Sequence, residues 1–451
     1  HRSYWQEIDF AAMVADHPIG DDFARLATTI SRDELRARQE ALFRRCVARA
    51  WQTAFYRRLW GAAGIEPGDV RGLDDLPRLP TFDKSDIMAS LDVAPPFGDF
   101  AGFETYPGGR PPVILHTTSG TTGKPQVLLF GPKSREVQAL LLARLYRWQG
   151  LRPGDVIHSV YGHGMINGGH YVREAVTHWT SAVFLSAGTG VETRSAQQVE
   201  IMRNFGATAI VGFADYIKKL AEVAKEQGLV PGRDIPVRMI SGHMGREDKA
   251  AISEAWGGAD CFDWYGVGDT GCIAGEGPDR DGLYVMEDAQ FLEVCDIETG
   301  LPVDDGQSGD MVVTCLYKDD LYPIIRFNTH DVTRVMTGTS SIDCRFKRIE
   351  GFLGRSDNMV KIRGINIFPQ AVGPMLDEAP EFAKEFVCKA RRDAQGRDAF
   401  VVVAETHAPD DPSVAARFAE ILKRKIGIEV EVELAGRGQT RSVAVPGGAF
   451  T

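Results

Sequence analysis

The chain has 451 residues, of which 43% are hydrophobic and 25% are charged, an ordinary composition for a globular protein. This length favours two or more domains and a large core. The 62 acidic and 51 basic residues give a formal charge of -11, which argues against a dedicated nucleic-acid-binding protein, because such a protein needs a basic face.

The cysteines and the apolar runs indicate the cellular compartment in which the protein is expected. Seven cysteines are scattered without a C-x-x-C pair, which is typical of reduced, intracellular proteins. Cys261, Cys272 and His243 are candidate zinc ligands, but their spacing is not a metal signature, and buried apolar thiols are the better interpretation. No apolar run approaches the roughly 18 residues of a membrane helix, and residues 1–10 lack a signal-peptide pattern. We therefore expect a cytoplasmic protein with no membrane partner and no nucleic-acid partner.

Residues 1–100 are expected to be mostly helical. Ser31 and Glu34 form a capping box, in which the serine caps a helix and the glutamate bonds back to the cap. Apolar residues then recur at helical spacing as far as about Ala50.

A stretch rich in glycine and hydroxyl side chains, residues 116–125, follows an apolar run at 112–115 that is expected to be a strand. It contains Thr117, Thr118, Ser119, Gly120, Thr121, Thr122, Gly123 and Lys124. Glycines allow close backbone approach, while backbone N–H groups, hydroxyls and an ammonium group bind phosphate. It is not a Walker A loop, since two residues separate the glycines and proline follows the lysine. A flexible polar loop is the alternative; the order of the ten residues favours a polyphosphate site.

Residues 113–335 alternate apolar runs with helical stretches, which indicates an α/β domain. The expected strands are 127–130, 156–160, 208–212, 237–241, 259–264, 285–295 and 310–315, and the clearest helices are 136–148 and 197–205. Residues 161–170 contain four glycines and are interpreted as a loop that lines a substrate pocket, with an ordinary glycine-rich turn as the alternative. Residues 360–363 alternate in a strand or hairpin pattern, and short strands and helices follow to the end of the chain.

The stretch 116–125 and the string 354–369, which reads GRSDNMVKIRGINIFP, resemble motifs of the adenylate-forming superfamily of acyl-CoA synthetases and adenylation enzymes, and most of all the phenylacetate–CoA ligases. Residues 265–271 and 322–331 support the resemblance, which covers essentially the whole chain. It implies a large α/β adenylation domain of several sheets at 1–353, with a helical lead-in at 1–100 and the ATP and acid site at 110–335. A small mobile α+β lid would follow at 354–451, with its hinge near Asp357.

The resemblance also implies roles for individual residues. Residues 117–124 would hold the phosphates of ATP, and Asp269 would serve Mg²⁺. The remaining nucleotide-binding residues would be Gly242, His243, Tyr265, Gly266, Thr270, Asp331, Arg355 and Lys361. The acid pocket would comprise Tyr161, His163, Asn167, His170, Phe213, Tyr216 and Gly266, and its polar share suggests a hydroxylated, aminated or dicarboxylic aryl acid. Lys124, Asp269 and the residue at position 439 are the catalytic candidates.

Gln439 stands where the resembling family carries a lysine that stabilises charge as the carboxylate attacks phosphorus. Glutamine supplies no charge, which leaves three interpretations. Adenylation is impaired, a cation such as Lys423, Lys425 or Arg441 takes over the role of the lysine, or the residue was changed deliberately. We expect an ATP-dependent acid–CoA ligase that forms an acyl-adenylate and passes the acyl group to coenzyme A. The open alternatives are an adenylating enzyme that loads a carrier-protein thiol or an amine, and a binder of nucleotide or acyl-CoA with impaired adenylation. A homodimer is a candidate assembly.

Overall fold

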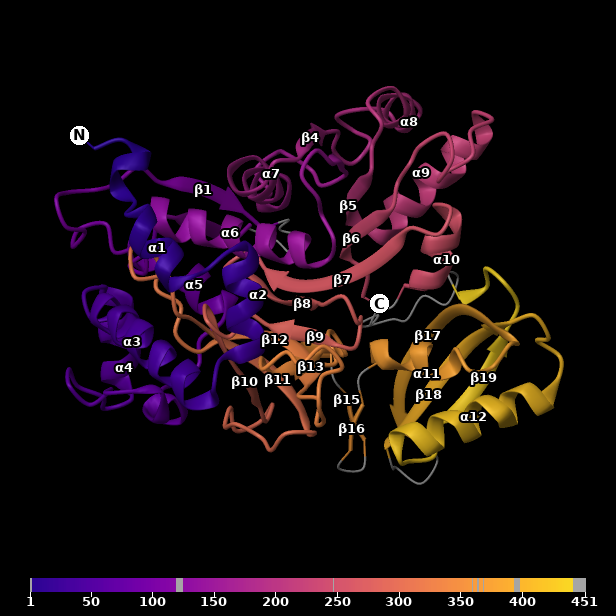
Figure 1. Cartoon of the computed structure of the whole chain (residues 1–451). Coiled ribbons are helices and arrows are strands. Elements are labelled where there is room, and N and C mark those ends of the chain that lie inside the picture. The colour runs from indigo at the N-terminus through magenta and orange to yellow at the C-terminus, as the bar shows by residue number, and fades with distance from the viewer. Residues whose placement is uncertain are drawn as a thin grey trace. The chain divides into compact units, whose positions relative to one another are not determined.

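The computed structural model describes residues 2–118, 125–245, 247–358, 360–362, 365–367, 369–392 and 398–440. The chain forms two compact units, His1–Thr329 with Arg334–Gly351, and His330–Thr333 with Phe352–Thr451. Both units mix helices with several sheets (Figure 1), which confirms the predicted α/β class.

Helices build the first hundred residues, as predicted (Figure 1). They are η1 (Tyr4–Glu7), α1 (Phe10–Asp16), α2 (Gly20–Thr29), α3 (Arg32–Ala50), α4 (Ala54–Ala62), η2 (Leu73–Arg78) and α5 (Lys84–Val93). The capping box is confirmed, because the Ser31 side chain accepts from the Glu34 N–H and the Ser31 N–H donates to Glu34 Oε2 at 3.0 Å. These bonds satisfy backbone groups that the first turn of α3 leaves unpaired.

The expected strand before the glycine-rich stretch is β1 (Ile114–Thr117), which pairs antiparallel with β2 (Val127–Phe130). Thr117 lies opposite Val127, at the end of this hairpin where residues 118–126 connect the two strands. Helix α6 (Pro132–Trp148) follows and begins four residues before the predicted start at 136.

An eight-stranded sheet forms the centre of the first unit, in the order β13-β9-β8-β7-β6-β5-β3-β4. Its strands are β3 (Val156–Ser159), β4 (Val183–Ser186), β5 (Ala209–Phe213), β6 (Met239–His243), β7 (Asp260–Val267), β8 (Gly271–Glu276), β9 (Leu283–Val285) and β13 (Arg348–Ile349). The strands from β4 to β7 run parallel, and those from β7 to β13 run antiparallel. The carboxyl ends of the parallel strands therefore meet at one edge, where ligands bind in open α/β sheets.

Helices cover this sheet and bury an apolar core (Figure 1). Helix α7 (Asn167–Trp179) packs against α6 and β4. Helix α9 (Ala214–Glu226) packs against β5, α10 (Lys249–Ala255) packs against β7, and α8 (Ser195–Asn204) packs against α9. Ile210, Leu220 and Trp256 are fully buried between these elements.

Two predictions of local structure were wrong. Residues 161–170 were expected to form one loop, yet α7 begins at Asn167. Gly169 allows this, because its N–H donates to the Gly162 carbonyl at 3.1 Å, and a Cβ on Gly169 would lie 2.3 Å from that oxygen. The apolar run 285–295 was expected to be one strand, but β9 ends at Val285 and β10 begins at Gln290.

A second sheet has the order β10-β11-β12-β14, with β10 (Gln290–Cys295), β11 (Ser308–Cys315), β12 (Phe327–Arg334) and β14 (Gly354–Arg355). The second unit contains the 3-10 helix η3 (Ser356–Asn358), the predicted hairpin β15 (Val360–Ile362) and β16 (Ile365–Ile367), the 3-10 helix η4 (Pro369–Ala371) and helix α11 (Val372–Leu376). A sheet of β17 (Phe382–Arg392), β18 (Asp398–Thr406) and β19 (Glu431–Ala435) packs with helix α12 (Pro412–Ile426) around Phe418 and Val402.

All seven cysteines are buried and unbridged, as predicted, and burial raises the pKa of Cys261 to about 12. Within the described residues, no helix has both the length and the apolar character that a membrane crossing needs.

Candidate functional site

A cavity of about 430 Å³ lies at the carboxyl ends of the parallel strands in the first unit. It is lined by Thr117, Thr118, Leu128, Tyr161, Gly162, Ile166, Asn167, Gly168, Tyr171, Val172, Thr189, Phe213, His243, Trp264, Gly266, Val267, Gly268 and Gly271. Most of this lining is apolar or aromatic, which is typical of small-molecule sites. The cavity brings together four of the predicted acid-pocket residues, Tyr161, Asn167, Phe213 and Gly266.

Thr117, Thr118 and His243, which were predicted to contact nucleotide, line the same cavity. Thr117 and Ile166 form a β-bridge, and the Thr117 N–H donates to the Met165 carbonyl at 2.8 Å. This contact fixes the start of the glycine-rich stretch beside the start of α7. The predicted phosphate-binding residues Ser119, Gly120, Thr121, Thr122, Gly123 and Lys124 lie outside the described residues.

Glycines let the strand ends approach closely at this edge. Gly212 on β5 lies opposite Gly242 on β6, and a Cβ on Gly242 would lie only 1.8 Å from the Gly212 carbonyl oxygen. At the β7–β8 turn, a Cβ on Gly266 would lie 2.2 Å from the Gly271 oxygen. Neither position accepts a side chain without moving backbone, so glycine is required at both.

Four rings form one wall of the cavity. The centroid of Tyr161 lies 5.2 Å from that of Phe213 and 6.0 Å from that of His243. The His243 ring in turn lies 5.4 Å from Phe213 and 4.3 Å from Trp264. These residues lie at or just beyond the ends of β3, β5 and β6 and within β7, so the parallel topology assembles them.

The wall is uncharged at neutral pH. Burial lowers the pKa of His243 to about 4 and raises the pKa of Tyr161 well above its usual range. Both side chains are therefore neutral, and the wall suits an aromatic or otherwise apolar group.

Asn167 supplies a polar group and is held by a buried ion pair. Arg135 NH1 donates to Asn167 Oδ1 at 2.5 Å, and the Arg135 guanidinium also pairs with Glu174. Arg135 lies 4.9 Å over the Phe130 ring and is fully buried. Because arginine only donates, Asn167 must present its amide oxygen to Arg135 and its Nδ2 elsewhere.

Three of the predicted acid-pocket residues do not line the cavity. His163 Nε2 lies 2.8 Å from Ser186 Oγ. His170 bonds to the carbonyls of residues 163 and 164 and stacks on the His116 ring at 4.8 Å. The Tyr216 hydroxyl lies 2.9 Å from Ser195 Oγ, on the α8 side of α9.

Asp269 is buried in a polar cluster next to the cavity. Its Oδ1 accepts from Gln126 Nε2 at 2.6 Å and from the Tyr322 hydroxyl at 2.5 Å. Lys318 donates to its carbonyl at 3.1 Å. Burial raises the pKa of Asp269 and lowers that of Lys318. Gln126 connects this cluster to the glycine-rich stretch, because its carbonyl accepts from the Thr118 N–H at 3.0 Å.

Tyr265 and Thr270 flank this cluster and are both buried. Tyr265 lies inside β7, where a register shift separates it from Gly266, and neither residue 265 nor residue 270 lines the cavity. The Thr270 carbonyl accepts from Tyr317 at 2.6 Å. Their nucleotide-binding roles remain predictions.

The second unit holds the other predicted nucleotide residues. Asp331 on β12 lies opposite Arg355 on β14, and Arg355 NH1 donates to Asp331 Oδ1 at 3.0 Å. Arg355 also forms a two-pronged pair with Asp357, at 2.9 and 2.6 Å. This pair lowers the pKa of Asp357, so the Asp357 carboxylate is ionised at neutral pH. Lys361 lies in β15.

Gln439 lies in a tight loop after β19. Its Oε1 accepts from the Gly436 N–H at 2.8 Å, and its own N–H donates to the Gly436 carbonyl at 3.1 Å. Glu405 accepts from the N–H groups of Gly438 and Thr440, at 2.8 and 2.9 Å. The side chain at position 439 thus contacts its own loop.

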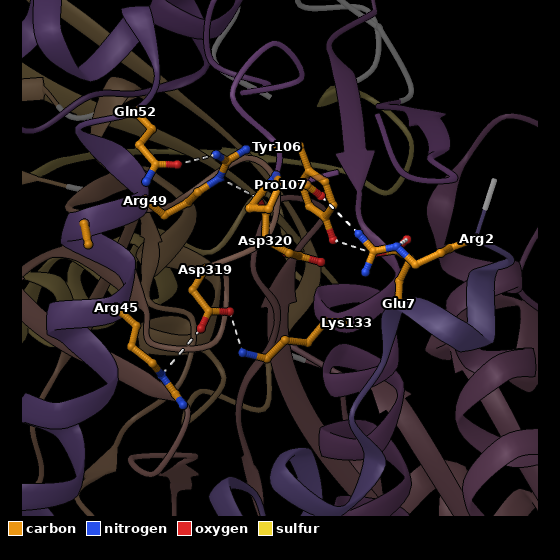
Figure 2. A pocket seen from close by; sticks show the side chains of 11 residues that line it. Arg2, Glu7, Arg45, Arg49, Gln52, Tyr106, Pro107, Lys133, Asp319 and Asp320 are labelled. Atoms are coloured by element: carbon orange, nitrogen blue, oxygen red, sulfur yellow. Dashed lines mark hydrogen bonds and ion pairs between the residues drawn. The ribbon is translucent and has the colours of Figure 1, made fainter. Parts of the chain in front are cut away.

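A second, larger groove of about 520 Å³ lies between α3, α6 and the N-terminal segment. Figure 2 shows that Arg45 and Lys133 both point toward Asp319, at 3.4 and 2.5 Å. Arg2 pairs with Glu7 at 3.0 Å in the same view (Figure 2). Arg45 also pairs with Asp16, and Arg49 donates to the carbonyls of residues 102, 105 and 320, so these cations are already engaged within the protein.

The sequence did not single out Trp264, Tyr171, Thr189 or Gln126 as site residues. Trp264 occurs in a run that predicts only a strand, and the contact of Trp264 and Tyr171 with the cavity depends on chain-distant neighbours. Gln126 had the clearest signal, since it directly follows the glycine-rich stretch.

Comparisons with known proteins agree with this geometry. Residues 364–444 match the family model of the AMP-binding enzyme C-terminal domain. The chain is 31% identical over 414 residues to phenylacetate-coenzyme A ligase of Thermus thermophilus, covering 89% of this chain and 85% of that protein. It is 29% identical to the same enzyme of Aromatoleum evansii, covering 90% of this chain and 91% of that one.

The fold is also similar to a 2-hydroxyisobutyryl-CoA ligase in its postadenylation state, with a TM-score of 0.75, 25% identity, and coverage of 94% of this chain and 90% of that one. The fold and the site thus define an adenylate-forming enzyme. Within that class, the chain belongs to the phenylacetate–CoA ligase family.

Proposed function

We propose that the protein is an ATP-dependent acid–CoA ligase that converts an aromatic carboxylic acid into an acyl-adenylate and then into a thioester, releasing pyrophosphate and AMP. The observation that carries this proposal is the aromatic cavity beside Thr117 and Thr118. Adenylation requires a carboxylate next to the α-phosphate of ATP, so an acid cavity that adjoins a phosphate-binding stretch meets that requirement. The relatives are phenylacetate-coenzyme A ligases, and the 2-hydroxyisobutyryl-CoA ligase was solved with an acyl-adenylate.

Each part of the site has a task in this proposal. Residues 117–124 bind the phosphates, with the Lys124 ammonium stabilising charge that develops as pyrophosphate leaves. Asn167 Nδ2 donates to the carboxylate at the end of the cavity next to Thr117. Asp331, an acceptor-only side chain when ionised, binds the ribose hydroxyls.

Asp269 suits Mg²⁺ that enters with ATP. Among the described residues, Gln126 and Tyr322 both use Oδ1, which leaves Oδ2 for a cation. A neighbouring dication would favour the ionised form that burial disfavours. When bound, Mg²⁺ neutralises phosphate charge.

The second half-reaction would use the second unit. We propose that it turns about Asp357, which brings Lys361 toward the active site before the thiol of coenzyme A attacks the acyl-adenylate. The cytoplasmic location and the homodimer also remain proposals.

The test is AMP and pyrophosphate release from ATP with a panel of aryl acids, with and without coenzyme A. We expect acid-dependent release of both, and a thioester only with coenzyme A. Lys124→Met should lower kcat by about 100-fold, the scale of a lost charge-stabilising donor, while the exposed Lys225→Met on α9 should leave it unchanged. Absence of acid-dependent release across the panel would refute the proposal.

Gln439 favours one alternative, a binder of nucleotide or acyl-CoA with impaired adenylation. The side chain is uncharged and its Oε1 bonds to Gly436 within its own loop. Acid-dependent exchange of pyrophosphate into ATP distinguishes an enzyme from a binder. Thioester formation with free coenzyme A distinguishes the ligase from an enzyme that loads a carrier protein or an amine.

A further inference from the structure

His243 places an imidazole in the aromatic wall of the acid cavity. Its ring lies 4.3 Å from Trp264 and 5.4 Å from Phe213, and it lines the cavity together with both. An apolar side chain would complete this wall equally well, so the nitrogen atoms of the ring need an explanation.

The tautomer of His243 follows from its hydrogen bond to the Trp264 carbonyl. Nδ1 lies 3.2 Å from the Trp264 carbonyl oxygen, and a carbonyl oxygen only accepts, so Nδ1 carries the hydrogen. Burial lowers the pKa of His243 to about 4, and the ring is therefore neutral at pH 7. A neutral imidazole has a single N–H, so Nε2 bears a lone pair.

Nε2 keeps accessible surface on a residue that lines the cavity. No residue in the described part of the chain makes a hydrogen bond with His243 Nε2. Nε2 is nevertheless not one of the buried polar atoms without a partner, which means that it keeps accessible surface. With the cavity empty, water can donate to Nε2. A ligand that fills the cavity removes that water and must replace its hydrogen bond, or leave a buried acceptor unpaired at a cost of about 1–3 kcal/mol.

Asn167 is a second polar group of the cavity, and the structure fixes its orientation too. Arg135 holds its Oδ1 at 2.5 Å, so its Nδ2 offers only donors. Residue 167 follows Ile166, which bridges to Thr117, and a donor there suits the carboxylate of the acid. His243 offers an acceptor instead, which a carboxylate cannot satisfy and a ring hydroxyl or amine can.

We propose that His243 Nε2 selects aryl acids that carry an O–H or N–H donor on the ring, such as phenolic and amino-substituted arylacetic or benzoic acids. This inference rests on the proposed function, since it assigns the cavity to the acid. The selectivity comes from the unpaired lone pair, because a site built to accept a hydrogen bond rejects an analogue that cannot donate.

The experiment compares matched acids in two assays. Phenylacetate and benzoate are each tested with their hydroxy and amino derivatives at the three ring positions and with the corresponding methoxy ethers, which keep the oxygen but lose the donor. AMP release gives kcat/KM, and calorimetry without ATP gives Kd, so selectivity is measured even if no acid is turned over. We expect the Kd of the best donor-bearing acid to be about 10–100-fold lower than that of its methoxy and unsubstituted counterparts, the scale of a paired against an unpaired buried group.

His243→Phe removes the lone pair and keeps a ring in the wall, so it should reduce this preference to within about three-fold. His243→Ala is the second variant, in case the larger ring disturbs the wall. His178→Phe is the matched control, because that histidine is also partly buried but bonds to Glu136, away from the cavity, and it should leave the preference unchanged.

Equal binding of donor-bearing, methoxy and unsubstituted acids by the unaltered protein would overturn the inference, as would a preference that survives in both His243 variants. Loss of AMP release with the binding preference intact would instead count against the proposed function alone.

Discussion

Gly242→Ala tests whether the strand ends at the cavity are as close as the structure has them. The new Cβ would lie 1.8 Å from the Gly212 carbonyl oxygen and 2.8 Å from its carbonyl carbon. A carbon and an oxygen need about 3.3 Å, so β5 and β6 would have to separate locally by roughly 1.5 Å. The obstacle is backbone, which a change of rotamer cannot relieve.

The cost follows from two terms. Overpacking costs about 1–3 kcal/mol, and weakening one or two bonds of the β5–β6 ladder costs about 0.5–1.5 kcal/mol each. The sum is roughly 1.5–6 kcal/mol, which should lower the midpoint of thermal unfolding by about 2–8 °C. Because His243 and Phe213 follow the two glycines directly, the Kd for the acid should rise at least about ten-fold.

The assays are thermal unfolding by circular dichroism and acid binding by calorimetry. Gly61→Ala is the control, since Gly61 lies exposed in α4 with no atom within 4 Å of a Cβ; it should be neutral or stabilise by about 0.5–1 kcal/mol. If Gly242→Ala retains both the unfolding midpoint and the affinity for the acid, the close contact of these strands is refuted.

Three further predictions concern charge. Burial raises the pKa of Asp263 from 3.8 to about 6, so the folded protein holds the carboxyl proton more tightly than the unfolded chain, and stability should fall as pH rises from 4 to 6. Asp263→Asn should flatten the dependence of stability on pH in this range. An unchanged dependence in the variant would contradict this prediction. Gln439→Lys should raise acid-dependent pyrophosphate exchange at least about ten-fold by supplying a cation, whereas no change would count against that position. Arg135→Met removes the buried cation that pairs with Glu174 and leaves Asn167 unheld, so it should cost about 3–5 kcal/mol and raise KM for the acid. A variant that melts like the parent protein would show that the pair contributes little.

Much of the local structure could be predicted from the sequence. The capping box at Ser31, the strand before residues 116–125 and most parallel strands depend on neighbours a few residues apart, and the structure confirms them. The strand or hairpin predicted from residues 360–363 corresponds to β15, which pairs with β16. Such features follow from hydrophobic periodicity and from the capping side chain of serine, both of which can be read from the sequence.

The acid cavity was decided by the tertiary structure. Tyr161, Phe213, His243 and Trp264 come from four separate parts of the chain and meet because parallel strands end at one edge of the sheet. Tyr216 lies only three residues after the end of β5, where Phe213 lines the cavity, yet its position in α9 directs the Tyr216 hydroxyl toward Ser195. Periodicity identifies a helix or a strand, but the direction of a side chain depends on what packs against that element, and those partners are distant in the sequence.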